Sequence, residues 1–309
     1  MNVPDGDYLL LIDASAYIHR GFHASARTVR RSDNQETGAI INFCWALLKM
    51  LRLNRTMIGR LPSHAAIVMD VRGPNFRHEM YPEYKAHREG YDPALESQLP
   101  FIPTIADAFG VQCIAIPGFE ADDVIATYAE LAQQSGLNVV IASSDKDLCQ
   151  LVSARVIMYD AMKDKDPERF DTSASIVDID AVKDKWGVFP WQFVDLQAIM
   201  GDKVDNVPGV PSIGPKKAAV LVNAFGSVEA MLDDADFGEA DRFKNEKEMN
   251  LIAEHADAVR ISKLLVELDR NVPVELSIDD LYIGGTDTRK LKEFFMSIEA
   301  PQLERRVDF

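Results

Sequence analysis

Short apolar runs alternate, along the first half of the chain, with longer segments whose apolar residues recur at helical spacing. The runs are typical of buried strands and comprise Tyr8–Ile12, Ala65–Met69, Val111–Ile116, Asn138–Ala142 and Arg155–Tyr159. Between them, Ala39–Leu53 and Ala121–Gln134 have the pattern of helices. This order predicts an α/β fold, with a mostly parallel central sheet flanked by helices on both faces.

The second half of the chain loses the strand pattern after about residue 176 and is typical of short helices. Ser212–Phe225 and Ser227–Leu232 are two such segments, and Gly226 joins them in a pattern that resembles a helix–turn–helix. We therefore predict two parts, an α/β domain over residues 1–175 and a helical region over residues 176–309. A third segment, Arg72–Pro93, has no apolar periodicity, and its Arg, His, Tyr and Lys residues by themselves favour a solvated loop.

The composition is that of an ordinary globular protein and leaves the nature of its partner open. Hydrophobic residues make up 47% of the 309 residues and charged residues 27%. The net charge of −16 by itself disfavours a nucleic-acid partner. The first 90 residues, however, carry 12 Lys and Arg against 9 Asp and Glu, so a mildly basic front precedes an acidic body. Net charge therefore does not decide between partners.

Membrane, secretory and disulfide-rich classes are disfavoured. No apolar run approaches the roughly 20 residues that a membrane-spanning helix needs. The N-terminal segment is acidic where a signal peptide would be basic. Cys44, Cys113 and Cys149 are scattered and odd in number, which suits neither a disulfide framework nor a zinc site. These features predict a cytoplasmic protein that does not contact membranes.

Acidic residues follow four successive predicted strands at the points where the strands end. They are Asp13 after the first strand, Asp70 after the second, Glu120, Asp122 and Asp123 after the third, and Asp145 and Asp147 after the fourth. The carboxyl ends of parallel strands share one edge of a sheet, so these side chains should gather there. Any one of them taken alone is equally well explained as a helix N-cap, but four strands in succession favour a site.

So many carboxylates at one edge require cations, because their mutual repulsion would otherwise destabilise the fold. Oxygen ligands without Cys or His suit Mg²⁺ or Mn²⁺. Two further acids, Asp202 and Asp205, are three residues apart and would face the same way on a helical turn. The glycine-containing segment after them, Val207–Lys217, opens a helix whose free N–H groups and two lysines favour a phosphate site.

Six stretches of the chain resemble the 5′-nuclease (flap endonuclease) family, and most closely the N-terminal 5′→3′ exonuclease domain of bacterial DNA polymerase I and its stand-alone relatives. The stretches are Leu9–Asp13, Met69–Glu79, Tyr84–Arg88, Gly118–Asp123, Ser144–Leu148 and Gly201–Lys217. They occur in family order from residue 8 to about 235, and a weaker likeness continues to the C-terminus. The resemblance implies a PIN-like, resolvase-like domain over residues 1–175. It also implies a helical arch at about residues 72–93 and a helix–three-turn–helix at about residues 202–232.

The resemblance assigns roles to individual residues. The implied ligands of two divalent ions, Mg²⁺ or Mn²⁺, are Asp13, Asp70, Glu120, Asp122, Asp123, Asp145, Asp147, Asp202 and Asp205. Lys85 and Arg88 are the implied catalytic cations, although a solvated basic face is the alternative for both. The residues expected to contact DNA are Arg20, Arg77, Tyr84, Gly209, Gly214, Lys216 and Lys217. The family's helix–three-turn–helix can also hold K⁺. Ser212 stands where relatives often have glycine, and Arg27–Arg31 has no place in the motifs.

Chemistry and resemblance together predict a metal-dependent 5′→3′ exonuclease or 5′ flap endonuclease of DNA replication and repair, with a two-metal mechanism. The expected partner of this monomer is branched, nicked or 5′-ended DNA, with RNA primers left open. The sequence is equally compatible with a stand-alone enzyme and with the front part of a polymerase. A non-catalytic junction-binding protein is one alternative, which the complete set of nine acids disfavours. A PIN-type ribonuclease is the other, and Gly201–Lys217 disfavours it.

Overall fold

The computed structural model describes residues 6–25, 28–53, 61–88, 90–163, 175–238 and 241–307. A six-stranded sheet with the strand order β3-β2-β1-β4-β5-β6 forms its centre. The strands are β1 (Tyr8–Asp13), β2 (His64–Val68), β3 (Gln112–Ile114), β4 (Asn138–Ala142), β5 (Val156–Tyr159) and β6 (Ile176–Val177). All neighbouring pairs are parallel except β5 and β6. The predicted α/β fold with a mostly parallel sheet is therefore confirmed.

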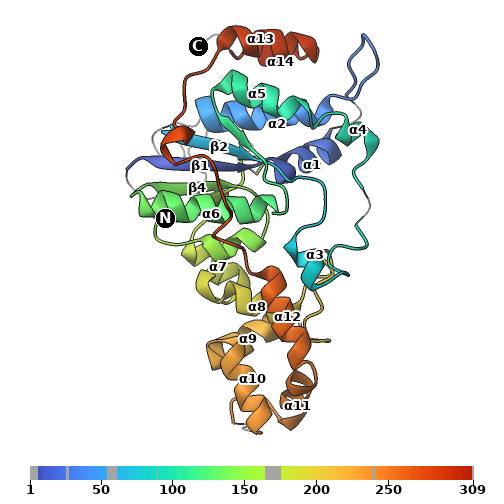
Figure 1. Ribbon diagram of the computed structural model, residues 1–309, viewed down its shortest axis with the longest axis vertical. Helices are drawn as coiled ribbons and strands as arrows, with labels where there is room; N and C mark the ends of the chain where they lie inside the picture. The colour runs from blue at the N-terminus through green and yellow to red at the C-terminus, as the bar shows by residue number, and fades with distance from the viewer. Residues whose placement is uncertain are drawn as a thin grey trace.

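Helices cover both faces of this sheet because alternate strand residues point to opposite sides. Leu10 and Ile12 of β1 belong to a core that they share with α1 (Ala14–Ala24), α2 (Gly38–Leu48) and α5 (Phe101–Phe109). Leu9 and Leu11 belong to a second core, which includes α6 (Ala121–Gln134). In Figure 1, α2 and α5 lie above the sheet and α6 lies below it. The single helix predicted over 39–53 becomes α2 followed by a π-helical turn, Lys49–Leu53.

The helical region extends from the lower side of the sheet in Figure 1. It comprises α7 (Ile179–Trp186), α8 (Phe193–Met200), α9 (Pro215–Phe225), α10 (Val228–Phe237), α11 (Glu246–Glu254) and α12 (Ala256–Val266). Short 3₁₀ segments lie at Asp147–Leu151, Pro190–Gln192 and Asp279–Leu281. The predicted helical pair appears as α9 and α10, and Gly226 between them takes a φ of 84°, which favours glycine.

The C-terminal segment returns to the sheet domain, which the division into two successive parts did not anticipate. Helices α13 (Thr288–Ser297) and α14 (Pro301–Glu304) join the same core as α2 and α5 (Figure 1). Arg30 donates to the carbonyl of Ser297 at 2.9 Å, and Glu299 accepts from the backbone N–H of Arg31 at 2.7 Å. Part of the unplaced basic motif, whose Arg27 lies outside the described residues, thus contacts the returning C-terminal segment.

The basic segment at 72–93 contains only short helical elements in its described part. Helix α3 (Phe76–Met80) is followed by turns over residues 82–87, and α4 (Pro93–Glu96) begins at its end. It is more closely packed than a solvated loop, since Arg77 and Tyr84 are both buried. Among the described residues, no helix is long and apolar enough to cross a membrane.

Candidate metal and nucleic-acid site

Seven of the nine predicted acids line one cleft of about 1040 Å³ at the carboxyl edge of the sheet. The acids in its walls come from the end of β1, from the segments after β2 and β4, and from the start of α6. One further acid comes from the turn at residues 201–207. These lining acids are Asp13, Asp70, Glu120, Asp122, Asp145, Asp147 and Asp205. Lys85, Arg88 and Lys146 line the same cleft. The predicted convergence of strand-end acids is therefore present, and basic side chains accompany it.

Four of these acids form no ion pair with any described Lys, Arg or His, and we call them the inner acids: Asp13, Asp70, Asp122 and Asp145. Asp13 caps α1 by accepting from Ala16 N at 3.0 Å, and it accepts from Ser143 Oγ at 2.7 Å. Asp70 accepts from Ser15 Oγ at 2.6 Å and from Ala121 N at 2.8 Å. Neutral donors thus orient these carboxylates without balancing their charge.

Because no described basic side chain balances the inner acids, the pKa values of two of them are raised. Burial, together with the charges of Asp70 and Asp145, raises the pKa of Asp13 to about 7, although Ala16 and Ser143 oppose the shift. Burial and the neighbouring carboxylates, with Asp145 first among them, raise the pKa of Asp122 well above its ordinary range. Both carboxyls are therefore difficult to ionise unless a cation enters the cleft.

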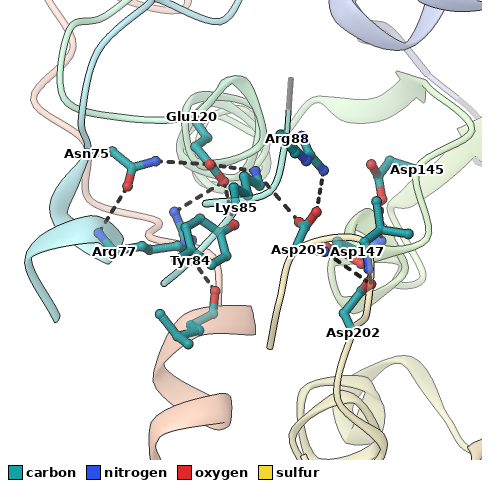
Figure 2. Close-up of polar contacts among 12 residues, drawn as sticks. Asn75, Arg77, Tyr84, Lys85, Arg88, Glu120, Asp145, Asp147, Asp202 and Asp205 are labelled. Atoms are coloured by element: carbon teal, nitrogen blue, oxygen red, sulfur yellow. Dashed lines mark hydrogen bonds and ion pairs between the residues drawn. The ribbon is translucent and has the colours of Figure 1, made fainter. Parts of the chain in front are cut away.

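The other five acids, which we call the paired acids, each form an ion pair with a basic side chain: Glu120, Asp123, Asp147, Asp202 and Asp205. Glu120 accepts from Lys85 Nζ at 2.5 Å, from Asn75 Nδ2 at 2.9 Å and from Tyr84 OH at 3.1 Å (Figure 2). Burial alone would raise the pKa of Glu120, but Lys85 and Arg77 hold it below its ordinary value. This carboxylate is ionised and already coordinated by protein groups.

Lys85 and Arg88 connect the basic segment to the turn that carries Asp202 and Asp205. Arg88 forms an ion pair with Asp205, and Lys85 Nζ lies 3.7 Å from Asp205 Oδ2 (Figure 2). Lys85 takes a φ of 53°, and its N–H donates to the carbonyl of Asp205 at 2.9 Å. A non-glycine residue in this region is strained, so the contact with Asp205 helps to fix Lys85 at the cleft.

The turn with Asp202 and Asp205 is not the helical turn expected from their spacing. It is closed by two backbone hydrogen bonds between Asp202 and Val207, of 3.0 and 2.7 Å. Both carboxylates still point toward the site, where Asp202 pairs with Lys146 and Asp205 with Arg88. Burial would raise the pKa of Asp202, but Lys146 keeps it below its ordinary value.

Asp123 and Arg77 occupy places different from those predicted. Asp123 is fully buried, and its two oxygens accept from Arg77 Nη1 and Nη2, both at 2.7 Å. Arg77 is 1% exposed and also donates to the carbonyls of Leu265 and Glu267 at the end of α12. The predicted metal ligand and the predicted DNA contact are thus joined in a buried ion pair between α3, α6 and α12.

Three further residues expected to contact DNA have other partners. Tyr84 is 3% exposed, and its hydroxyl donates to Glu120. Gly209 is buried, and its N–H donates to Ser262 Oγ at 3.0 Å instead of facing a phosphate. A side chain at Gly209 would meet the backbone of Gly201 at 2.3 Å, so close packing requires glycine here. Arg20 lines the cleft while pairing with the buried Asp160 at 2.8 Å.

Helix α9 begins with exposed residues and no side-chain cap, and the phosphate site at this helix start stays a prediction. Gly214 precedes the helix without a side-chain cap, and it is exposed together with Lys216 and Lys217. Ser212 takes a φ of 66°, which explains why a glycine would suit this position. Its carbonyl accepts from Lys217 Nζ at 3.3 Å.

The inner acids fit divalent cations by their chemistry, since all are oxygen donors and their charge is not balanced by protein groups. Among the described residues, no group of three or more His, Cys, Asp or Glu side chains is arranged to hold an ion as it stands. Arg77, Lys85, Arg88 and Lys146 instead form ion pairs with the paired acids. An ion that uses the paired acids would therefore have to displace these basic side chains.

Sequence reasoning missed three residues that shape this site. Asn75 caps α3 and donates to Glu120, Gln197 Nε2 donates to Asp147 at 2.6 Å, and Lys146 pairs with two acids. The only available sign was the alternating order Asp145-Lys146-Asp147, which places a lysine between two predicted ligands. Nothing in the local sequence indicates the positions of Asn75 and Gln197.

Two family models match the chain in succession. The 5′-3′ exonuclease N-terminal resolvase-like domain matches residues 8–187, and the 5′-3′ exonuclease C-terminal SAM fold matches residues 188–289. The chain is 42% identical to the DNA polymerase I of Rhizobium leguminosarum over 303 residues, which cover 98% of this chain but only 28% of that relative. The chain thus spans less than a third of the length of this polymerase.

A stand-alone relative and a solved structure complete the comparison. The chain is 33% identical to the 5′-3′ exonuclease of Aquifex aeolicus over 300 residues, covering 97% of this chain and 95% of that protein. Its fold resembles that of a T5 flap endonuclease in a pseudo-enzyme-product complex with DNA and metal ions. The TM-score is 0.62 at 19% identity, with 97% of each chain covered, so this likeness concerns the fold alone.

Proposed function

The chain belongs to the 5′-3′ exonuclease family, and from this membership we propose that it is a metal-dependent 5′→3′ exonuclease and 5′ flap endonuclease. Its substrate would be DNA near junctions of single strand and duplex. The observation that carries the proposal is the set of four unbalanced inner acids, which face the same cleft as Lys85 and Arg88. In such an arrangement the carboxylates can bind divalent cations, and the basic side chains can bring the DNA phosphates to these cations.

Divalent ions, when bound by the inner acids and by Glu120 or Asp147, would supply an activated water and neutralise charge on the reacting phosphate. The resemblance favours Mg²⁺ or Mn²⁺ and two ions. The raised pKa values of Asp13 and Asp122 support the same conclusion, because an entering cation would let both carboxyls ionise. Asp123, with both oxygens on Arg77, is proposed to position α6 instead of binding an ion directly.

Lys85 and Arg88 are proposed to bind and orient the scissile phosphate. Both side chains now pair with acids of the site, Lys85 with Glu120 and Arg88 with Asp205. Arg88 is half exposed, so it can turn to an entering phosphate while Lys85 stays anchored by its backbone. Donors held at the place where negative charge develops stabilise a transition state more than flexible ones.

Duplex DNA is proposed to lie along the start of α9. The uncapped N-terminus at Gly214 and the exposed Lys216 and Lys217 provide N–H donors and positive charge without base-specific groups. A K⁺ ion at this element is also proposed, with the carbonyl of Ser212 available once Lys217 turns toward DNA. Binding of this kind recognises the DNA backbone, as an enzyme that acts on many sequences requires.

Membership of the 5′-3′ exonuclease family favours nicked, branched or 5′-ended DNA as the partner, and we propose that the chain acts on it in the cytoplasm as a monomer. A PIN-type ribonuclease is disfavoured because the family likeness continues through residues 188–289, beyond the resolvase-like domain. A non-catalytic junction-binding protein is disfavoured because the inner acids are complete and face an open cleft.

The proposal is tested with a 5′-labelled flap, a nicked duplex and the unpaired single strand, all of one sequence. In Mg²⁺ we expect short 5′-labelled products that end near the junction, and none in EDTA. Tight binding of the flap without cleavage in Mg²⁺ or Mn²⁺ would identify a junction-binding protein instead. Cleavage of a matched RNA but not of DNA would identify a ribonuclease.

A further inference from the structure

Lys146 stands between two acids of the site in the sequence and, in space, bridges one of them to a third. It lies in the sequence Asp145-Lys146-Asp147, directly after the loop that follows β4. Its ammonium forms an ion pair with Asp202, and its Nζ lies 3.1 Å from Asp147 Oδ1. Asp147 comes from the sheet edge and Asp202 from the turn after α8. One ammonium therefore links the α/β domain to the helical region.

The two carboxylates are held in place by other groups, so the ammonium is not needed to orient them. Gln197 Nε2 donates to Asp147 at 2.6 Å, and Val204 N donates to Asp202 Oδ1 at 2.7 Å. Asp202 is 8% and Asp147 19% exposed at the side chain, whereas Lys146 is 30% exposed. The acids form the fixed part of this arrangement, and the lysine, with its long flexible stem, forms the movable part.

We propose that Lys146 is a resident counter-ion at an outer cation position between Asp147 and Asp202, and that a divalent ion binds there only after the ammonium has left. This inference rests on the proposed metal-dependent function. The inference goes beyond that function because it attributes to Lys146 the difference between the outer position and the inner acids in their affinity for divalent ions. The inner acids have no such competitor among the described residues.

The physical basis is that two cations cannot share the same carboxylates. A divalent ion between Asp147 and Asp202 would lie where the ammonium now lies, and repulsion between the two at a few ångströms is large in a partly buried site. Binding therefore includes the work of breaking an ion pair with a carboxylate that is almost buried. The partial exposure of Lys146 provides its way out, since its head group can move into the cleft that it already lines.

The resident ammonium also accounts for the stability of the site without an ion. Asp147 and Asp202 would otherwise repel each other and the inner acids across the cleft. With Lys146 in place the outer position is neutralised in part, and the protein can fold before it binds metal. The consequence is a sequential filling of the site, in which the inner position is occupied at lower ion concentration than the outer one.

The test is a Mn²⁺ titration of DNA-free protein, in which the electron paramagnetic resonance signal of free Mn²⁺ reports binding. Wild type, Lys146→Met and Lys203→Met are compared. Lys203 is exposed, adjoins Asp202 and has no ion pair with it, so it controls for the loss of one positive charge. We expect Lys146→Met to bind the outer Mn²⁺ about tenfold more tightly, with the inner class unchanged, and Lys203→Met to change either class by less than about twofold.

Melting curves in EDTA and Mn²⁺ provide a second measurement, with Lys146→Gln as an additional variant that retains a hydrogen-bond donor. Removing the ammonium should lower the melting temperature in EDTA and increase the rise produced by Mn²⁺. Equal outer affinity in wild type and in both Lys146 variants, or weaker affinity in the variants, would overturn the inference and leave the proposed function intact. Absence of Mn²⁺ binding by every protein, wild type included, would overturn both.

Discussion

The inner acids line one cleft together with three of the paired acids, Glu120, Asp147 and Asp205, and the two groups differ in how their charge is balanced. Asp122 and Asp123 are neighbours in α6 and represent the two groups. Asp122 is half-buried and has no ion pair with a described residue, and its pKa is raised well above the ordinary range by burial and nearby carboxylates. Asp123 is fully buried and paired with Arg77. Basic side chains of the protein thus balance the acids that join its segments, whereas the inner acids, proposed to bind an external ion, have no such partner among the described residues.

This difference assigns the paired acids to the stability of the fold and the inner acids to the proposed function. Arg77, Lys85, Arg88 and Lys146 neutralise the paired acids and join the sheet edge, the basic segment and the helical region. Two of the inner acids, Asp13 and Asp122, have raised pKa values, as is common where a site is prepared for a ligand. Five predictions test this division, beginning with the largest expected effect.

Asp145→Asn should reduce hydrolysis by roughly a thousandfold, on the order of 4 kcal/mol in the barrier, because it removes a proposed ligand charge while retaining the shape of the side chain. DNA affinity should hold or rise, because repulsion of the phosphate decreases. Single-turnover cleavage and equilibrium binding of one flap substrate measure both effects. Cleavage at the wild-type rate would exclude Asp145 from the metal site.

The same substitution at two neighbouring residues should have opposite effects on stability in EDTA. Asp123→Asn leaves the buried Arg77 without its counter-charge and should destabilise the protein by about 3–5 kcal/mol. Asp122→Asn removes an unbalanced charge and should stabilise it by about 1 kcal/mol. Urea unfolding of both variants decides the matter, and a loss of stability of equal size in both would remove the distinction between the two groups.

The metal-free protein should become less stable as the pH rises toward 7. Asp13 keeps its proton to a pKa of about 7 in the folded state, whereas an unfolded aspartate loses it near pH ~3.9. Between these values the folded state binds more protons, so its stability falls by about 2 kcal/mol from pH 5 to pH 7. Thermal melts in EDTA at several pH values measure the slope, and a flat profile would argue against an unbalanced Asp13.

Mg²⁺ or Mn²⁺ should stabilise the wild type by mass action, by about 2.7 kcal/mol when the free ion is at about 100 times its Kd. Asp122→Asn is the matched variant, because it should reduce this gain while retaining the fold. Melting temperatures in EDTA and in millimolar ion provide the comparison. Coincident curves for the wild type would count strongly against an ion site at the inner acids.

Lys216 and Lys217, which form no ion pair with the acids of the site, should contribute to DNA binding and not to the chemical step. Changing Lys216 and Lys217 to alanine should weaken duplex binding for all sequences and reduce the salt dependence by up to about two ion equivalents. KM should rise with kcat nearly unchanged, since neither lysine is proposed to touch the reacting phosphate. A fall of kcat at saturating DNA would place them in the chemistry instead, and an unchanged salt slope would remove α9 from the DNA interface.

The gathering of acids at one sheet edge could be predicted because it follows from local pattern. Five apolar runs gave the parallel strands, and the position of Asp13, Asp70 and Asp145 just after strands placed them at the carboxyl edge. The helical pair around Gly226 was predicted in the same way, from periodicity and from the glycine between the two segments, and the structure gives that glycine a positive φ. Apolar residues recur about every two positions in strands and about every 3.6 in helices, so these elements can be predicted without knowledge of distant contacts.

The sequence by itself thus predicted the family, the five parallel strands and most of the carboxylates that line the cleft, since these depend on strand order and short motifs. Only the tertiary structure decided which of them are neutralised. The pairs that do so join residues 46 positions apart for Arg77 and Asp123, 56 for Lys146 and Asp202, and 117 for Arg88 and Asp205. Ion pairing depends on where folded segments meet and on how deeply they are buried, and no local pattern contains that information.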